Sequence, residues 1–255
     1  MKDIEYVLDF AAGLGCYMLE SGANLERAND TMNRVCYSYG LKEVSIFSLS
    51  SIIQIGAKTQ DGESAFRQVA VGGMDIHLNR LNELNRLSRR VCSEKPAPSS
   101  LQYLLDEAQK AQGYPGWLMA AGRIVAMGCM VVLFGGTLSD IVVTDLVSLC
   151  LIFLIDALSR ANLNHIIVNL ISMCFASSAA MLFYRFGLCH SFFVVIITCS
   201  MILIPGIALV NAFRNLLCGN EMNGILEVLK AAIETLAIVL GLLVGIVLFG
   251  GGLLW

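Results

Sequence analysis

Charged residues are distributed very unevenly along this chain. Residues 113–255 carry only six Asp or Glu and five Lys or Arg, whereas residues 1–112 carry 14 acids and 12 bases. About a quarter of the residues in an ordinary soluble domain are charged, so residues 113–255 cannot cover a globule with polar surface. We therefore expect residues 1–112 to form a soluble domain and residues 113–255 to form a membrane domain.

Five apolar stretches in the second segment have the length of a membrane span. A helix needs about 20 apolar residues to cross about 30 Å of hydrocarbon. We place the spans at residues 117–134, 141–159, 165–184, 191–211 and 228–249. The connections between them are short, so the sequence predicts a compact α-helical membrane bundle of five transmembrane helices.

The Lys and Arg residues near the span ends predict the orientation of this bundle. If the first span starts inside the cell, Arg185 lies outside, and four basic residues lie toward the cytoplasm: Arg123, Arg160, Arg214 and Lys230. Positive residues collect on the cytoplasmic side of membrane proteins. The N-terminus also lacks the basic and apolar regions of a signal peptide. We expect the N-terminus in the cytoplasm and the C-terminus outside.

The soluble segment mixes helical and strand periodicity. Helical spacing of apolar residues occurs in four segments, residues 3–20, 24–40, 75–90 and 101–111. Residues 44–49 and 53–55 alternate with a period near two, which indicates a β-hairpin or short sheet. Asn24 is expected to open the second helix and Gly40 to end it. The sequence predicts a cytoplasmic α+β domain followed by a hinge at residues 113–116.

The soluble segment lacks the sequence motifs of enzymes and cofactor sites. Its single histidine, His77, has no Ser/His/Asp arrangement, phosphate-binding loop or metal-ligand cluster around it. The nine cysteines are scattered, without a C-x-x-C pair, as reduced structural cysteines are. A net charge of −3 argues against a nucleic-acid partner. We therefore expect no catalytic residues, no metal and no cofactor.

Two carboxylates of the second span are candidates for ion coupling. Charged residues inside a span are costly and are therefore informative about function. Asp145 has no basic residue within four positions, whereas Asp156 has Arg160 one helical turn later and is also explained as half of a neutralised pair. Asp140 and Asp145 both lie at the mouth of the same span and are also explained as solvated helix caps, although Asp145 is the deeper of the two.

The last span carries a second charged pair and a glycine motif. Lys230 and Glu234 lie one turn apart and are explained as another neutralised pair. Gly241 and Gly245 form a G-x-x-x-G motif, which permits close helix packing, and we expect this face to contact a partner subunit. His165, at the start of the third span, is expected to lie at the membrane interface.

The most specific local feature is the tripeptide at residues 204–206, Ile-Pro-Gly. Proline lacks an N–H and clashes with the carbonyl four residues earlier, and a single helix over residues 192–217 would be about 39 Å long, too long for an untilted span. Asn211, Arg214 and Asn215 share one helix face beyond the proline. Two explanations are open: a helix broken at a transport site, or a kinked span followed by an interfacial helix.

Four segments of the sequence resemble the N-terminal half of the threonine/serine exporter family: SGANLERANDTMNRVCYSYGL, LNRLNELNRLSRR, FGGTLSD and IPGIALVNAFRNLLCGNEMNG. The resemblance covers nearly the whole chain, in order. It implies a cytoplasmic domain, five spans and a place in the bacterial cytoplasmic (inner) membrane. It also implies export of a small carboxylate-bearing metabolite, either a threonine- or serine-type amino acid or a dicarboxylate such as succinate.

The resemblance also assigns site residues. Pro205, Gly206, Asn211 and Arg214 match the family's P-G-x-x-x-x-N-x-x-R core, which implies that they bind substrate together with Asn215. The family commonly has Asp where this chain has Asn215, so a candidate proton carrier is missing at that position.

The resemblance further implies a partner. Members of the family are fused to a second membrane half or split into two polypeptides, and this chain resembles the larger subunit of a split pair. We expect a second, smaller membrane subunit and an ion gradient as energy source, with protons as the candidate ion, since no ATP-binding motif is present. The alternatives are a membrane receptor or assembly scaffold whose cytoplasmic domain binds a protein, and a membrane-embedded hydrolase.

Overall fold

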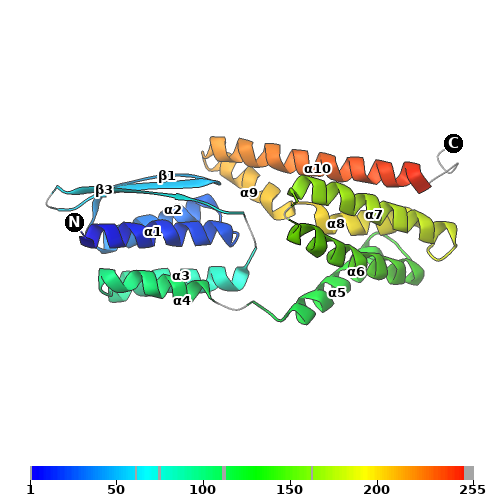
Figure 1. Cartoon of the computed structure of the whole chain (residues 1–255), viewed down its shortest axis with the longest axis horizontal. Coiled ribbons are helices and arrows are strands. Elements are labelled where there is room, and N and C mark those ends of the chain that lie inside the picture. The colour runs from blue at the N-terminus through cyan, green and yellow to red at the C-terminus, as the bar shows by residue number, and fades with distance from the viewer. Residues whose placement is uncertain (1, 61, 74–75, 111–112, 162, 250–255) are drawn as a thin grey trace. The chain divides into compact units, whose positions relative to one another are not determined.

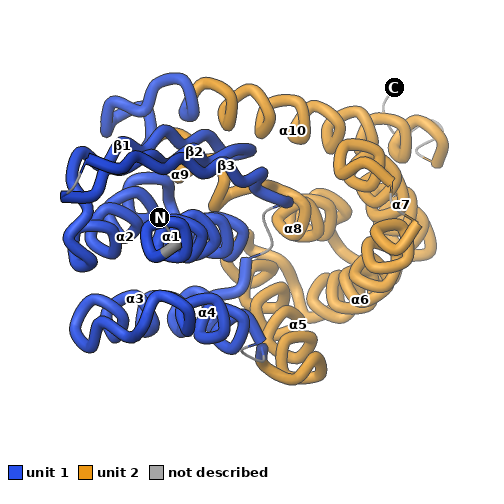
Figure 2. Tube along the Cα trace, turned by 60° about the vertical axis from the view of Figure 1, so that its left-hand side comes forward, with its two compact units in different colours: residues 1–113, 214–224 blue, residues 114–213, 225–255 orange. Residues whose placement is uncertain are grey.

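The computed structural model describes residues 2–60, 62–73, 76–110, 113–161 and 163–249, with the elements labelled in Figure 1. These residues divide into two compact units, coloured separately in Figure 2. Unit 1 comprises residues 1–113 and 214–224, and unit 2 comprises residues 114–213 and 225–255. Residues 214–224 lie in the segment expected to be membrane-embedded, yet they pack with the N-terminal residues.

The described part of unit 1 contains four α-helices: α1 (Lys2–Glu20), α2 (Leu25–Ser38), α3 (Leu78–Glu94) and α4 (Leu101–Gln109), the last preceded by a 3₁₀ turn, η1 (Pro98–Ser100). The limits of α2 confirm the sequence prediction. The Asn24 side chain accepts a hydrogen bond from the Arg27 N–H at 2.9 Å, as a helix N-cap does. Gly40 follows the helix with a positive φ of 78°, which glycine adopts without strain.

The sheet of unit 1 has three antiparallel strands in the order β1 (Lys42–Leu49), β2 (Ile52–Lys58) and β3 (Ser64–Ala70). The predicted hairpin is β1 with β2. Strand β3 was not predicted from the sequence; it pairs with β2 from Ile52 opposite Ala70 to Lys58 opposite Ser64. The β3 side chains are only half-buried on one face and exposed on the other, so the strand lacks a strong apolar alternation. Residues 74–75 and 111–112, where predicted helix ends fall, lie outside the described residues.

Helix α1 forms the centre of the unit 1 core. It packs against α2, α4 and the strands β2 and β3. Leu8, Phe10, Leu14 and Met18 on this helix are fully buried, and each such side chain contributes about 1.5–3 kcal/mol by leaving water. Unit 1 therefore has a hydrophobic core of its own.

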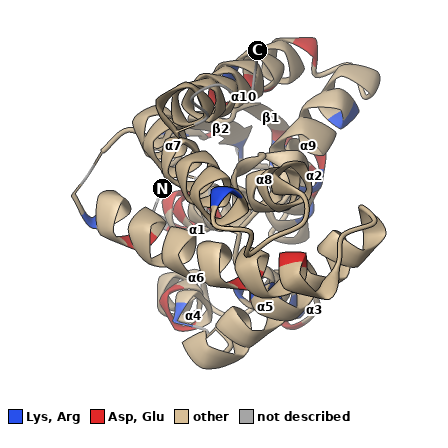
Figure 3. Cartoon of the chain, turned by 90° about the vertical axis from the view of Figure 1, so that its right-hand side faces the viewer, with Lys and Arg blue, Asp and Glu red and all other residues tan. Residues whose placement is uncertain are grey.

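The described part of unit 2 consists of helices: α5 (Gly116–Leu133), α6 (Leu138–Arg160), α7 (His165–Arg185), α8 (Phe192–Leu203), α9 (Gly206–Leu217) and α10 (Glu221–Phe249). The last residues of α9 and the first residues of α10 belong to unit 1. Charged side chains are sparse on these helices (Figure 3). Four helices, α5, α6, α7 and α10, are long and apolar enough to cross a membrane, and the pair α8–α9 makes a fifth if it counts as one span.

The chain bends by 59° between α8 and α9. Helix α8 ends at Leu203, Ile204 is extended with φ −67° and ψ 125°, and α9 begins at Gly206. The cause is Pro205, because a proline displaces the residue before it from the helical region and cannot donate to the carbonyl four residues back. The helix is thus broken at the position that the sequence indicates.

Helix α10 lies beside α7 (Figure 1), and its glycine motif packs against α7 of the same chain. A Cβ atom on Gly241 would lie 3.1 Å from the Cys174 backbone nitrogen, and one on Gly245 would lie 2.7 Å from the Cys174 carbonyl oxygen. The interpretation of these glycines as a packing face is confirmed. The expectation that this face meets a partner subunit is wrong, because α7 already occupies it.

Replacing either glycine is expected to destabilise the helix pair. Gly241→Leu or Gly245→Leu would drive a side chain into the α7 backbone, with an overpacking cost of about 1–3 kcal/mol or more. Thermal unfolding of the detergent-purified protein measures this loss. The matched control is Gly122→Leu on α5, where a Cβ meets no atom within 4 Å. Equal melting temperatures for all three variants would contradict the packing described.

Candidate functional site

The five residues predicted to bind substrate lie at the start of α9 or along it. Pro205 and Gly206 form the break, and Asn211, Arg214 and Asn215 follow on α9. Asn211 is half-buried, Arg214 is exposed and Asn215 is buried. Because Asn211 and Asn215 are four residues apart, they share one face of the helix.

Arg214 pairs with a residue that the sequence analysis did not single out. Its Nη2 lies 3.7 Å from Oε2 of Glu26 on α2, and the two side chains are 52% and 54% exposed. An exposed pair of this kind contributes about 0–1 kcal/mol. The Arg214 guanidinium is therefore held only weakly and can exchange Glu26 for another carboxylate.

Residues 214–224, here called the connector, join α9 to α10 and are fixed to the turn between β1 and β2. The Asn223 side chain is 4% exposed. Its Nδ2 donates to the Ser48 carbonyl at 3.0 Å, and its Oδ1 accepts from the Ser50 N–H at 3.0 Å. Ser48 is also hydrogen-bonded through its hydroxyl to Asn29 on α2. One amide thus closes both hydrogen bonds to the hairpin turn.

Asp140 is a buried cap that joins two loops. Its carboxylate accepts from the N–H and hydroxyl of Thr137, which makes a capping box at the start of α6. The other oxygen accepts from the backbone N–H groups of His190 at 2.7 Å and Ser191 at 3.0 Å. The expectation of a solvated cap is wrong, because Asp140 is fully buried and its hydrogen bonds hold the start of α8 against the start of α6.

The two predicted ion-coupling carboxylates differ in their surroundings. Asp145 is half-buried beside α5, where a Cβ on Gly128 would lie 3.9 Å from its Oδ2, and its Oδ1 is buried without a hydrogen-bond partner among the described residues. Asp156 is exposed near the end of α6. It forms no ion pair with Arg160 in the described structure, so the neutralised pair expected from the sequence is not formed.

Buried hydroxyl groups accompany Asp145 in unit 2. In the described structure, the hydroxyls of Thr144 on α6, Ser172 on α7 and Thr198 on α8 are buried without hydrogen-bond partners. Ser148 lies 3.8 Å from the Cys199 sulfur and links α6 to α8. Unpaired polar groups are costly in an apolar interior. Sequence analysis missed these groups because single Ser and Thr residues in apolar runs form no pattern.

Cys16 and Cys36, two of the cysteines of unit 1, are poor nucleophiles. Burial raises the pKa of Cys16 to about 11, with a further contribution from the Glu20 carboxylate, and burial raises the pKa of Cys36 to about 12. A thiol acts as a nucleophile only as thiolate, which is scarce at neutral pH when the pKa is raised. All nine cysteines of the chain are free.

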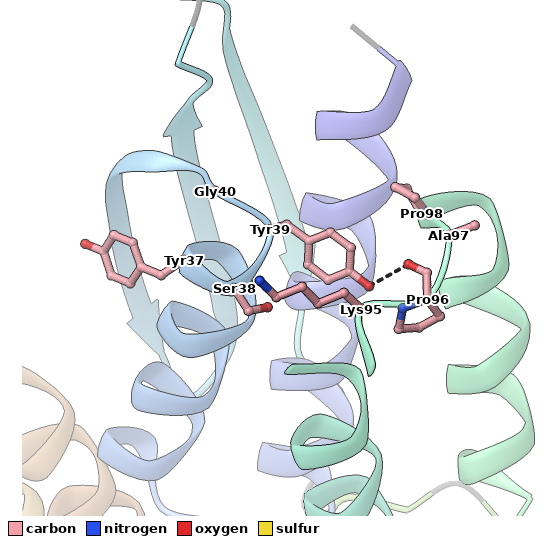
Figure 4. Close-up of a pocket in the computed structure, with 8 residues that line it drawn as sticks. All are labelled: Tyr37, Ser38, Tyr39, Gly40, Lys95, Pro96, Ala97 and Pro98. Carbon is pink, nitrogen blue, oxygen red and sulfur yellow. Dashed lines mark hydrogen bonds between the residues drawn. The ribbon is translucent and has the colours of Figure 1, made fainter. Parts of the chain in front are cut away.

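A shallow cavity of about 550 Å³ lies in unit 1 between residues 37–40 and 95–98 (Figure 4). The Tyr39 hydroxyl in this cavity donates to the Pro96 carbonyl at 2.8 Å, and burial raises the pKa of that hydroxyl. Besides Tyr39, the ionisable side chains of the lining are Tyr37 and Lys95. The Ser38 hydroxyl of the lining donates to the Val35 carbonyl at 2.7 Å, and the described residues contain no group of three potential metal ligands.

The comparisons with known proteins decide the family. The family model described as threonine/serine exporter matches residues 9–249. The chain belongs to the threonine/serine exporter family. This confirms the resemblance drawn from the sequence motifs, and the family is one of exporters rather than enzymes.

One curated relative agrees with this assignment. The protein named "Threonine/serine exporter" from Corynebacterium glutamicum is 23% identical over 255 residues, which cover 94% of this chain and 50% of the relative. This member of the threonine/serine exporter family thus spans about half the length of the curated relative it matches. No solved structure matches the chain.

Removing the Asn223 side chain is expected to loosen the connector. Asn223→Ala deletes both hydrogen bonds to the β1–β2 turn, at about 0.5–1.5 kcal/mol each. Hydrogen exchange of the Ser50 amide should accelerate by about tenfold or more. The control is Asn220→Ala, because the Asn220 side chain has no hydrogen bond within the described structure. Unchanged exchange at Ser50 in the Asn223 variant would contradict the assigned contact.

Proposed function

We propose that this chain is one subunit of a secondary exporter for small carboxylate-bearing metabolites, either threonine- or serine-type amino acids or a dicarboxylate such as succinate. The observation that carries the proposal is the helix broken at Pro205 in a member of an exporter family. Secondary transporters use broken helices because the freed backbone groups and helix ends bind substrate.

The polar residues beyond the break suit a carboxylate substrate. Arg214 can bind a carboxylate through two parallel hydrogen bonds, and its exposed pair with Glu26 at 3.7 Å is weak enough to be displaced. Asn211 and Asn215 lie on the same helix and can donate or accept hydrogen bonds to the rest of the molecule. We assign substrate binding to these three residues together with the backbone at Pro205 and Gly206.

Asp145 is our first candidate for coupling export to an ion gradient, with protons as the ion. Its Oδ1 is buried without a partner in the described structure, so a bound proton would relieve the cost of an unpaired charge. Asp156 is the second candidate, but its exposure on α6 gives it no such environment.

A second, smaller membrane subunit is proposed as the partner. Only 6% of the apolar window of α5 is buried, so this helix offers a long surface to another membrane protein. The curated relative is about twice as long as the region that matches this chain, which supports a second half. The split into two polypeptides is itself part of the proposal.

The proposed location is the bacterial cytoplasmic (inner) membrane, with the N-terminus in the cytoplasm and the C-terminus outside. The arrangement of Lys and Arg near the span ends supports this orientation. Residues 250–255, at the C-terminal end, lie outside the described residues. The alternative of a receptor or scaffold has no support in either comparison, since both name exporters.

Reconstitution tests the proposed function. Proteoliposomes that contain this chain and its partner subunit should release preloaded threonine, serine or succinate when a proton gradient is applied, whereas liposomes with this chain alone should not. Release is measured with radiolabelled substrate. Absence of release for every substrate with both subunits present would overturn the proposed function, and release by this chain alone would remove the need for a partner.

A pair of variants separates the two possible roles of Arg214. If the guanidinium binds substrate, Arg214→Gln should lower efflux by at least tenfold, whereas Glu26→Gln should retain more than half of it, because that variant only frees the guanidinium. Both proteins should melt at similar temperatures, since the exposed pair is weak. Equal losses of efflux in the two variants would assign Arg214 to the ion pair instead.

A further inference from the structure

A second cavity lies wholly within unit 2, between the start of α7 and α10. Its volume is about 490 Å³, within the range of small-molecule sites. The polar lining consists of Asn164 and His165 at the beginning of α7 and of Lys230 and Glu234 on α10. The remaining lining is aliphatic. None of the α9 residues assigned to substrate binding lines this cavity, so it is a separate site.

The cavity is lined by one positive and one negative side chain that have no partner among the described residues. Lys230 and Glu234 lie four residues apart on α10, which separates them by about 6 Å along the helix axis. Within the described structure, neither side chain forms an ion pair or a hydrogen bond with the other or with any further residue. The neutralised pair expected from the sequence is thus not formed, and both charges line the cavity without an ionic partner among the described residues.

The position of these charges along α10 fits a loading site. Helix α10 runs from Glu221 to Phe249, and the 20 residues 230–249 already cross about 30 Å of hydrocarbon. Lys230 then lies at the membrane boundary and Glu234 one turn inside it. In the proposed orientation this end of α10 and the start of α7 both lie on the cytoplasmic side, where an exporter takes up its substrate.

We propose that this cavity is a loading site for a zwitterionic α-amino acid. Lys230 binds the α-carboxylate and Glu234 binds the α-ammonium group, while the aliphatic lining and Asn164 receive the side chain of the ligand. The two charged groups of an α-amino acid are bonded to one carbon, so a single molecule can bridge side chains about 6 Å apart along a helix. The inference rests on the proposed function, because a loading site requires an exporter.

The charges of the cavity also discriminate between the two proposed substrate classes. A dicarboxylate that bound Lys230 with one end would direct its second carboxylate toward Glu234, and like charges repel. The cavity therefore favours an amino acid over succinate. Specificity of this kind comes from the repulsive group as much as from the attractive one.

Calorimetric titration of the purified complex of this chain and its partner tests the site. L-threonine should bind the wild-type complex, and Lys230→Gln and Glu234→Gln should each weaken this binding by at least tenfold. L-threoninol, which lacks the carboxylate, should be insensitive to Lys230→Gln. Succinate should bind more tightly to Glu234→Gln than to the wild-type protein. Arg185→Gln and Glu107→Gln, exposed charges outside the cavity, are the controls and should leave all affinities unchanged.

The charge-reversed double variant distinguishes loss of the binding charges from misfolding of the protein. Lys230→Glu combined with Glu234→Lys keeps both charges in the cavity and should recover part of the threonine affinity lost in the single variants. Wild-type affinity in both single variants, no threonine binding by the wild-type complex, or no recovery in the double variant would overturn the site.

Efflux separates this inference from the proposed function. Threonine binding through these residues without efflux refutes the exporter alone, whereas full efflux in both single variants refutes the site alone.

Discussion

In hydrocarbon, every backbone N–H and C=O group needs a partner inside the protein, and Pro205 removes one such partner within an apolar stretch. The chain responds by ending α8 at Leu203 and restarting at Gly206 with a bend of 59°. Backbone groups that an unbroken helix would have paired are left for other partners at this point. The polar residues that follow on α9 therefore lie next to a place where the backbone departs from helical pairing.

The sequence predicted features that depend on local patterns. Apolar length located the helices of unit 2, and the Asn24 cap and Gly40 stop of α2 follow from the preferences of those residues at helix ends. Strand β3 was missed because its side chains are at best half-buried, and a strand without a buried face has little alternation to detect.

Contacts between distant residues were beyond the sequence. The G-x-x-x-G motif predicted close packing but not the identity of the neighbouring helix, and Asn223 contacts residues of the β1–β2 turn more than 170 positions away in sequence. Two charged pairs with identical spacing in the sequence also have different surroundings in the structure. Asp156 with Arg160 and Lys230 with Glu234 have the same four-residue separation, yet the first two residues are exposed at the end of α6 and the second two line a cavity. A charge pattern on one helix says nothing about what stands opposite.

The connector makes unit 1 discontinuous in sequence. Its 214–224 segment packs with residues 1–113, and Asn223 supplies the turn of a hairpin with two hydrogen bonds that the hairpin cannot make by itself. A chimera that exchanged only residues 1–113 between family members would place a foreign turn against the native Asn223. A working chimera should therefore exchange the N-terminal region together with the connector. Paired substitutions during divergence should also arise between these two segments.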